Sequence, residues 1–165
     1  IDAFNIDVKG DEDFYRTYCG GSLAPVLRNL EKISIDGRAV AEVTTLVIEG
    51  IHNQDDIFRM GCQLKDAGVQ VWHLSRFFPA YKMLDRKETS EDFLRDLLQT
   101  ASESGIPYIY SGNSRERLFV STNCPVCGSV LIPTHSYLGE AGGSVDRRIP
   151  DGNCAVCGNS IYGLF

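Results

Sequence analysis

The chain has 165 residues, of which 43% are hydrophobic and 23% are charged, and its formal net charge is −6. This composition is ordinary for a globular protein, and the length suits one modest domain with a small appendage. The acidic charge disfavours nonspecific binding to nucleic acid, and no apolar run approaches the roughly 20 residues of a membrane helix. We therefore expect a cytoplasmic protein that binds neither nucleic acid nor membrane.

The first nine residues alternate between apolar and polar side chains, which predicts a strand. The polar face of this strand carries Asn5, Asp7 and Lys9, near the strand's carboxyl end. The pattern is already complete at Ile1, which is not a methionine, so we expect the chain to be part of a longer protein.

Helix and strand signals then alternate as far as Gly112. Gly37 marks a helix end, Asn53 is a candidate N-cap, and Thr89 with Asp92 resembles a capping box. The predicted helices are residues 23–35, 55–67 and 89–104, and the predicted strands after the first are residues 40–50, 69–77 and 107–113.

This order of elements predicts an α/β fold in which helical crossovers join parallel strands. Four strands are too few for an eight-stranded barrel, so we expect a partial, or half, β/α barrel. From Ser114 onward, glycines, short β runs and cysteine pairs replace the helical pattern. We therefore predict two domains, residues 1–113 and 114–165.

Two near-identical motifs, CPVCG at 124–128 and CAVCG at 154–158, carry four of the six cysteines. Each places two thiols on a tight turn, and the glycine that follows can adopt a positive φ. Four thiolates can surround one zinc ion at about 2.3 Å, and the same ligands also accept iron. The motifs predict a structural metal site in a small rubredoxin-like zinc ribbon with β arms at 130–133 and 160–165; its ligands are Cys124, Cys127, Cys154 and Cys157.

A run of motifs in chain order resembles the C-terminal part of the radical S-adenosylmethionine (SAM) protein of the AmmeMemoRadiSam system, which is similar to the activating enzymes of pyruvate formate-lyase. The resemblance covers nearly the whole chain and implies a partial barrel that holds a 4Fe–4S cluster and SAM. The motifs are NIDVKG, FYRTYCGG, PVLRNLE, VTTLVIEGIHN, WHLSRFFPAYKMLDR, YIYSGN and the two cysteine pairs.

The resemblance also implies roles for individual residues. Asp7 and Lys9 match a DxK strand motif that faces SAM in the related activating enzymes, and Thr44 lies where they place a cofactor contact. Phe78 stands where the family commonly carries a histidine. The CxxxCxxC loop that holds the cluster is absent from this sequence, so we expect the chain alone to be inactive.

Two functions remain open at this stage. One is a radical SAM enzyme when full length, acting on a protein or small-molecule substrate with a possible Memo-like partner. The other is a non-catalytic, metal-stabilised module that docks onto a protein partner.

Other residues with reactive or charged side chains could also be functional. We expect Cys19 and Cys62 to be buried, inert thiols and His52 and His135 to lie in loops. A core role and a functional role both remain open for His73. Arg76 and Lys82 could bind a carboxylate or could form salt bridges within the chain.

Overall fold

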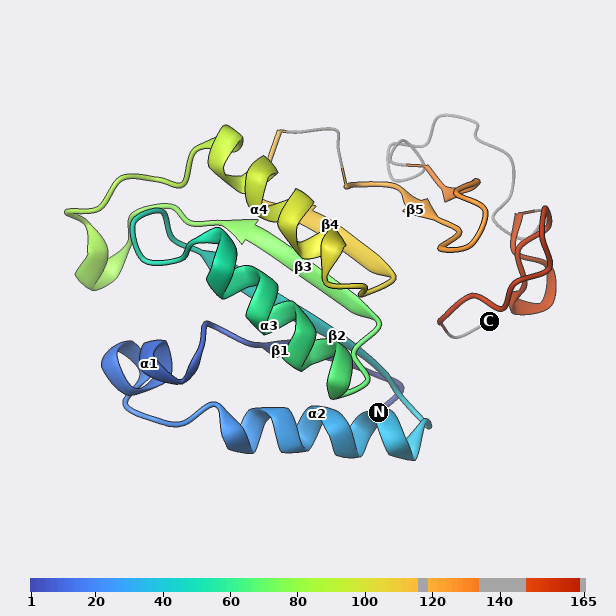
Figure 1. Cartoon of the computed structure of the whole chain (residues 1–165), viewed down its shortest axis with the longest axis horizontal. Helices are drawn as coiled ribbons and strands as arrows, with labels where there is room; N and C mark the ends of the chain where they lie inside the picture. The colour runs from blue at the N-terminus through green and yellow to red at the C-terminus, as the bar shows by residue number, and fades with distance from the viewer. Residues whose placement is uncertain (116–118, 134–147, 164–165) are drawn as a thin grey trace. The chain divides into compact units, whose positions relative to one another are not determined.

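A computed structural model of the chain describes residues 1–115, 119–133 and 148–163 (Figure 1). The chain forms two compact units, Ile1–Glu116 and Arg117–Phe165. The division falls close to Ser114, where the sequence pattern changes. His135, which was predicted to lie in a loop, is outside the described residues.

The first unit is built on a four-stranded parallel sheet. Its strands are β1 (Ala3–Asp7), β2 (Val40–Val47), β3 (Val71–Arg76) and β4 (Tyr108–Gly112), and their order in the sheet is β1-β2-β3-β4. Each strand pairs in parallel with its neighbour in the chain. The predicted α/β fold with four parallel strands is therefore confirmed.

Three helices connect the strands: α2 (Ala24–Asp36), α3 (Gln54–Asp66) and α4 (Glu91–Glu103) (Figure 1). Because strand order follows chain order and such crossovers are right-handed, all three helices lie on the same face of the sheet. Exposure alternates accordingly along β2, where Val43, Thr45 and Val47 are buried and Glu42 and Thr44 are partly exposed. The second face of the sheet is therefore left mainly polar, with Leu46 also exposed on it, and no helix covers it among the described residues.

Local signals set most of the helix ends. Gly37 ends α2 with a φ of 64°, as predicted. Asn53 caps α3, and Asp56 completes a capping box by accepting from the Asn53 backbone N–H. The predicted capping role of Thr89 is wrong, because Ser90 caps α4.

Thr89 has a different role from the one predicted. Its side chain is fully buried, and its hydroxyl donates to the Val47 carbonyl at 2.7 Å. The segment before α4 crosses the end of β2, where that carbonyl needs a donor. The Thr89 hydroxyl therefore satisfies a strand carbonyl, one residue before the N-cap Ser90.

Short helices follow β1 and β3 where the sequence has no helical periodicity. They are α1 (Glu12–Phe14), the π-helix η1 (Tyr15–Cys19) and the 3₁₀ helix η2 (Tyr81–Met83). Cys19 is exposed at the end of η1, and Cys62 on α3 is only partly buried. The prediction that both thiols are buried is therefore wrong.

A chain of hydrogen bonds runs through the core of the first unit. The Trp72 indole N–H donates to the Thr45 hydroxyl at 2.9 Å, and this hydroxyl donates to the Val8 carbonyl at 2.6 Å. Trp72 and Thr45 are fully buried. Side chains of β3 and β2 are thus linked to the backbone of the residue that follows β1, in addition to the backbone pairing of the sheet.

The second unit contains a two-stranded antiparallel sheet of β5 (Thr122–Asn123) and β6 (Val130–Ile132). The predicted arm at 130–133 corresponds to β6. The predicted arm at 160–165 contributes a single bridge between Ser160 and Asn153 among the described residues. In the described part of the chain, no helix has both the length and the apolar character that crossing a membrane requires.

Candidate metal centre and polar sheet face

The two cysteine motifs fold into near-identical turns. In the first, the Gly128 N–H donates to the Cys124 carbonyl at 2.9 Å; in the second, the Gly158 N–H donates to the Cys154 carbonyl at 2.8 Å. Both glycines have positive φ, 72° and 74°, as predicted. The repeated sequence thus produces a repeated backbone that aims two thiols from each turn toward the other.

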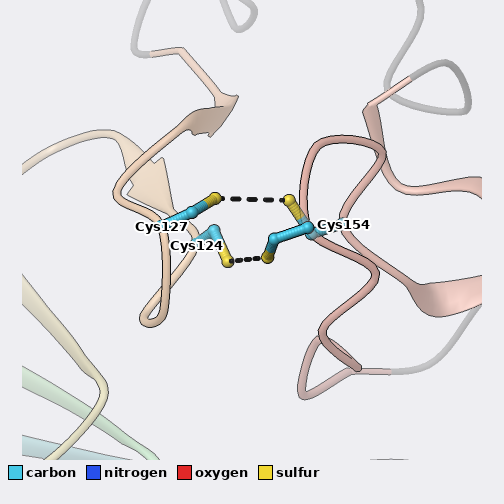
Figure 2. A group of neighbouring side chains, drawn as sticks. Cys124, Cys127 and Cys154 are labelled. Atoms are coloured by element: carbon cyan, nitrogen blue, oxygen red, sulfur yellow. Dashed lines mark hydrogen bonds between the residues drawn. The ribbon is translucent and has the colours of Figure 1, made fainter.

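The four sulfurs converge on one point. All lie within 4.8 Å of one another, Cys124 and Cys157 are 3.6 Å apart, and Cys127 and Cys154 are 3.7 Å apart (Figure 2). Four sulfurs at about 2.3 Å from a zinc ion would be separated by about 3.8 Å, whereas a disulfide needs about 2.05 Å. The cysteines predicted to form a metal site therefore lie together with the spacing of a single-ion tetrahedron.

Hydrogen bonds favour the thiolate form that metals bind. The Ser129 hydroxyl first, and then the backbone amides of Cys157 and Val156, lower the pKa of Cys154 to about 6. The same hydroxyl is the largest cause of the lowered pKa of Cys127. A cation can therefore displace the protons of Cys127 and Cys154 more easily than those of ordinary thiols.

The pKa of Cys157 is shifted in the opposite direction. The backbone amide of Asn159 lowers the pKa of this thiol, but partial desolvation and the three neighbouring sulfurs together raise the pKa to about 12. Four crowded thiolates repel one another in the absence of a positive charge. A divalent ion would supply that charge, which fits a metal centre better than four free thiols.

The uncovered face of the sheet carries a row of polar side chains from all four strands. Register pairs Asp7 with Thr44, Thr44 with His73, and His73 with Tyr110. Register partners in a parallel sheet point to the same face, about 4.8 Å apart. Two predicted cofactor contacts, Asp7 and Thr44, are therefore neighbours in this polar row.

His73 and Tyr110 extend the row beyond the residues that were predicted. Their rings stack with centroids 5.1 Å apart and an interplanar angle of 25°. His73 Nε2 lies 3.2 Å from Glu42 Oε2, but the alignment is not that of a hydrogen bond, and this nitrogen has no hydrogen-bond partner among the described residues. This ring nitrogen can donate or accept a hydrogen bond, depending on the tautomer.

Lys9 lies just past the carboxyl end of β1. Its Nζ is 2.7 Å from the Asp7 carboxylate, and both side chains are about half exposed. The Thr44 hydroxyl donates to the Asn5 side-chain oxygen at 3.1 Å. The three predicted cofactor contacts, Asp7, Lys9 and Thr44, thus lie near one another on β1, just after it and on β2, and none is buried.

His52 fixes the loops that follow β1 and β2. Its Nδ1 accepts from the Ile48 N–H at 3.0 Å, so its Nε2 carries the proton and donates to the Lys9 carbonyl at 2.9 Å. The side chain is buried, and burial lowers its pKa. The predicted loop histidine therefore holds the Lys9 backbone in place.

Beside His52 is a surface depression of about 310 Å³ between the same two loops. The carboxylates that line it already have partners in the chain. Asp11 accepts from the Phe14 N–H, Asp13 pairs with Arg16, and Asp56 belongs to the α3 capping box. These interactions explain the acidic residues without a ligand.

Arg76 is structural. Its side chain is buried, donates to the Thr89 carbonyl at 2.7 Å and pairs with Glu91 at 2.5 Å and Glu88 at 3.4 Å. The Ser114 hydroxyl is the largest cause of the lowered pKa of Glu91, to which the Arg115 backbone amide and the Arg76 guanidinium add. The ion pairs thus join β3 to α4, and hydrogen bonds from Ser114 and Arg115 to Glu91 add the residues that follow β4.

Comparison with known proteins gives one informative match. No protein-family model matches this chain. A protein of Methanocaldococcus jannaschii, named "Uncharacterized protein MJ0808", is 33% identical over 164 residues, which are 98% of this chain and 48% of that protein. The chain thus spans about half the length of the curated relative that it matches.

The sequence predicted the cysteine cluster and named Asp7, Lys9 and Thr44, which lie near one another in the structure. The role of His73 was left open, because alternation does not reveal which face the helices cover. Glu42 and Tyr110 gave no distinctive signal and were missed. Ser129 was also missed. The only available signal was a difference between the two motifs: Ser129 follows the first, and Asn159 occupies the corresponding position after the second.

Proposed function

We propose that this chain is a C-terminal part of a radical SAM enzyme of the activase type. In this proposal the four-stranded sheet is half of a β/α barrel, and the cysteine unit is a zinc ribbon. The observation that carries the proposal is the polar row of Asp7, Thr44, His73 and Tyr110 across the face that the helices leave uncovered. Ligands of parallel β/α folds bind at the carboxyl ends of the strands, where Lys9 adds a cation.

The Asp7–Lys9 pair suits the charges of SAM. The Lys9 ammonium can bind the carboxylate of its methionine part, and the Asp7 carboxylate can bind its amine. An exposed ion pair contributes little stability, so a ligand can separate these two side chains at small cost. Thr44 and His73 would provide hydrogen bonds farther along the row.

The iron–sulfur cluster requires ligands from outside these 165 residues. The sequence has no CxxxCxxC, and sulfurs that all lie within 4.8 Å enclose one ion rather than a 4Fe–4S cube. The relative extends well beyond the matched region, which leaves room for such a loop in a full-length protein. When bound, the cluster and SAM would supply reductive cleavage of SAM and hydrogen abstraction from a protein or small substrate. In this proposal the enzyme is cytoplasmic and has a Memo-like protein as partner.

The test uses the full-length gene product, reconstituted anaerobically with iron and sulfide. Dithionite and SAM should yield 5′-deoxyadenosine, and Asp7→Asn or Lys9→Met should raise the KM for SAM by about tenfold or more, since each removes a charge-assisted contact. Asp36→Asn, which removes an exposed carboxylate paired with Arg38, is the matched control. Absence of 5′-deoxyadenosine from the wild-type protein would overturn the proposal.

A docking module is the second candidate, because both cysteine turns present an exposed apolar tip. The exposed fractions of Val126 and Val156 are 69% and 74%. Exposed apolar side chains on a rigid metal-bound turn could contact a protein partner. Binding of the Memo-like protein that is lost in Val126→Ser/Val156→Ser, without 5′-deoxyadenosine formation by the full-length protein, would favour this function.

A further inference from the structure

The two cysteine turns differ in one side chain that lies against the sulfurs. In the first turn, the Ser129 hydroxyl is 3.1 Å from the Cys127 sulfur and 3.4 Å from the Cys154 sulfur. In the second, the Asn159 side chain donates to the Ser160 carbonyl at 2.8 Å. The backbones match, because Cys124 and Cys154 donate to the carbonyls of Ser129 and Asn159 in the same way.

We propose that Ser129 is a positioning residue of the metal centre, whose hydroxyl donates to the Cys127 sulfur and links the first turn to Cys154 of the second. The inference rests on the four-cysteine metal site, and it goes beyond the proposed enzyme activity. One hydroxyl has one proton, so the shorter contact receives the main hydrogen bond and the longer contact shares it. The chain segments that carry these sulfurs are far apart in sequence, so this contact helps to fix the distance between them.

A hydrogen bond to a metal-bound thiolate has two physical effects. It orients the ligand before the metal arrives, and it withdraws electron density from the sulfur once the metal is bound. Ser129 therefore makes Cys127 and Cys154 weaker donors than Cys124 and Cys157. Among the described residues, no side-chain hydroxyl contacts the other two sulfurs, so the centre is electronically asymmetric despite its duplicated sequence.

The accessible sulfurs offer an internal comparison. Cys127 and Cys157 are both exposed and occupy equivalent positions in the two turns. The Ser129 hydroxyl contacts the first and not the second. A metal-bound thiolate that accepts a hydrogen bond is a poorer nucleophile, so Cys157 should react with an alkylating agent before Cys127.

The experiment measures zinc affinity of the full chain by competition with a chromophoric chelator. Ser129→Ala should weaken zinc binding about tenfold, the lower range for losing an outer partner of a ligand. Ser129→Thr keeps the hydroxyl and should bind within about twofold of the wild type. Asn159→Ala is the matched control, and it should also stay within about twofold.

Two further readouts separate a hydrogen bond from a general structural effect. In the cobalt(II)-loaded protein, Ser129→Ala should shift the thiolate-to-cobalt charge-transfer band to longer wavelength, because the sulfur regains electron density. When the zinc-loaded proteins are treated with substoichiometric iodoacetamide, which forms a sulfur–carbon bond and releases iodide, Cys127 of the variant should be alkylated as fast as Cys157.

The experiment distinguishes failure of the metal-site prediction from failure of the role proposed for Ser129. If the wild-type chain binds neither zinc nor cobalt in a four-thiolate environment, both the metal site and the role of Ser129 are overturned. If the wild type binds and Ser129→Ala matches it in affinity, spectrum and alkylation order, the role of Ser129 alone is overturned. Equal losses in Ser129→Ala and Asn159→Ala would also overturn it.

Discussion

Two neighbouring threonines on β2 have opposite environments. Thr45 points into the core, where it accepts from Trp72 and donates to Val8. Thr44 points to the uncovered face, where it donates to Asn5. A buried polar group without a partner costs more free energy than an exposed one, because water cannot replace the lost bond.

This difference gives a stability prediction. Thr45→Val keeps the shape of the side chain but leaves the Trp72 N–H without an acceptor, so the free energy of unfolding should fall by about 2 kcal/mol. Urea unfolding followed by tryptophan fluorescence measures the change. Thr44→Val is the matched control and should cost about 0.5 kcal/mol or less; similar losses in both variants would contradict the prediction.

His52 gives a prediction about pH. Its pKa is lowered in the folded chain, so the folded state binds fewer protons at this group than the unfolded state does. The stabilising contribution is fully present above the unfolded pKa of about 6.5 and is lost as the pH falls below it toward the lower folded pKa. The added proton would also lie on Nδ1, against the Ile48 N–H.

The measurement is the free energy of unfolding of the wild type and of His52→Gln between pH 8 and pH 5. The wild type should be the more stable protein at pH 8, and its advantage should shrink as the pH falls below about 6.5. Other groups titrate in both proteins and cancel in the difference. An advantage that is constant with pH would show that His52 does not titrate in this way.

At the scale of elements, α3 and α4 approach each other at Gly61. A Cβ built at this position would lie 2.4 Å from the Ser104 Cβ and 3.1 Å from the Trp72 ring. Alanine is a better helix former than glycine by about 1 kcal/mol, so propensity alone favours a substitution. The absence of a side chain therefore serves the contact between the helices.

We predict that Gly61→Ala destabilises the chain by about 1–3 kcal/mol despite the gain in helix propensity, because the helices must move apart. Gly61→Ala/Ser104→Gly removes the nearer obstacle and should recover part of the loss. Thermal unfolding followed by circular dichroism compares the three proteins. A stabilising effect of the single variant would show that α3 and α4 separate without cost.

The longer elements were predictable because local and tertiary signals agree in them. The strand 40–50 has β-branched residues and the helix 55–67 has a cap, and both occur within a few residues of the predicted bounds. The segment 12–19 was missed because its helical turns depend on the Asp11 cap and on Tyr15 packing, without apolar periodicity. Thr89 was assigned wrongly because the carbonyl that it satisfies belongs to a distant strand.

The site could be predicted only where spacing in the sequence fixes spacing in space. Two C-x-x-C motifs together supply the four thiolates that one metal ion needs, so the cysteine cluster could be predicted from the sequence. The row of Asp7, Thr44, His73 and Tyr110 depends on strand register, which comes from pairing between segments more than 25 residues apart. Ser129 could be recognised only after the two turns were placed around the same sulfurs.

At the scale of the whole molecule, the two compact units should respond differently to loss of metal. The described residues of the second unit form short strands and bury few apolar side chains, so a metal ion would supply much of the stability of this part. A strong zinc chelator should therefore disorder the second unit while the sheet of the first unit persists. Amide NMR spectra would show the selective loss, and uniform loss across both units, or none, would contradict it.

The order β1-β2-β3-β4 also bears on how the chain folds during synthesis. After β2 has paired with β1, each new strand of this sheet finds its partner in the strand that precedes it in the chain. A single helical crossover separates each pair, and vectorial growth shortens the time for which apolar strands are exposed. The sheet can therefore be assembled cotranslationally, one crossover at a time.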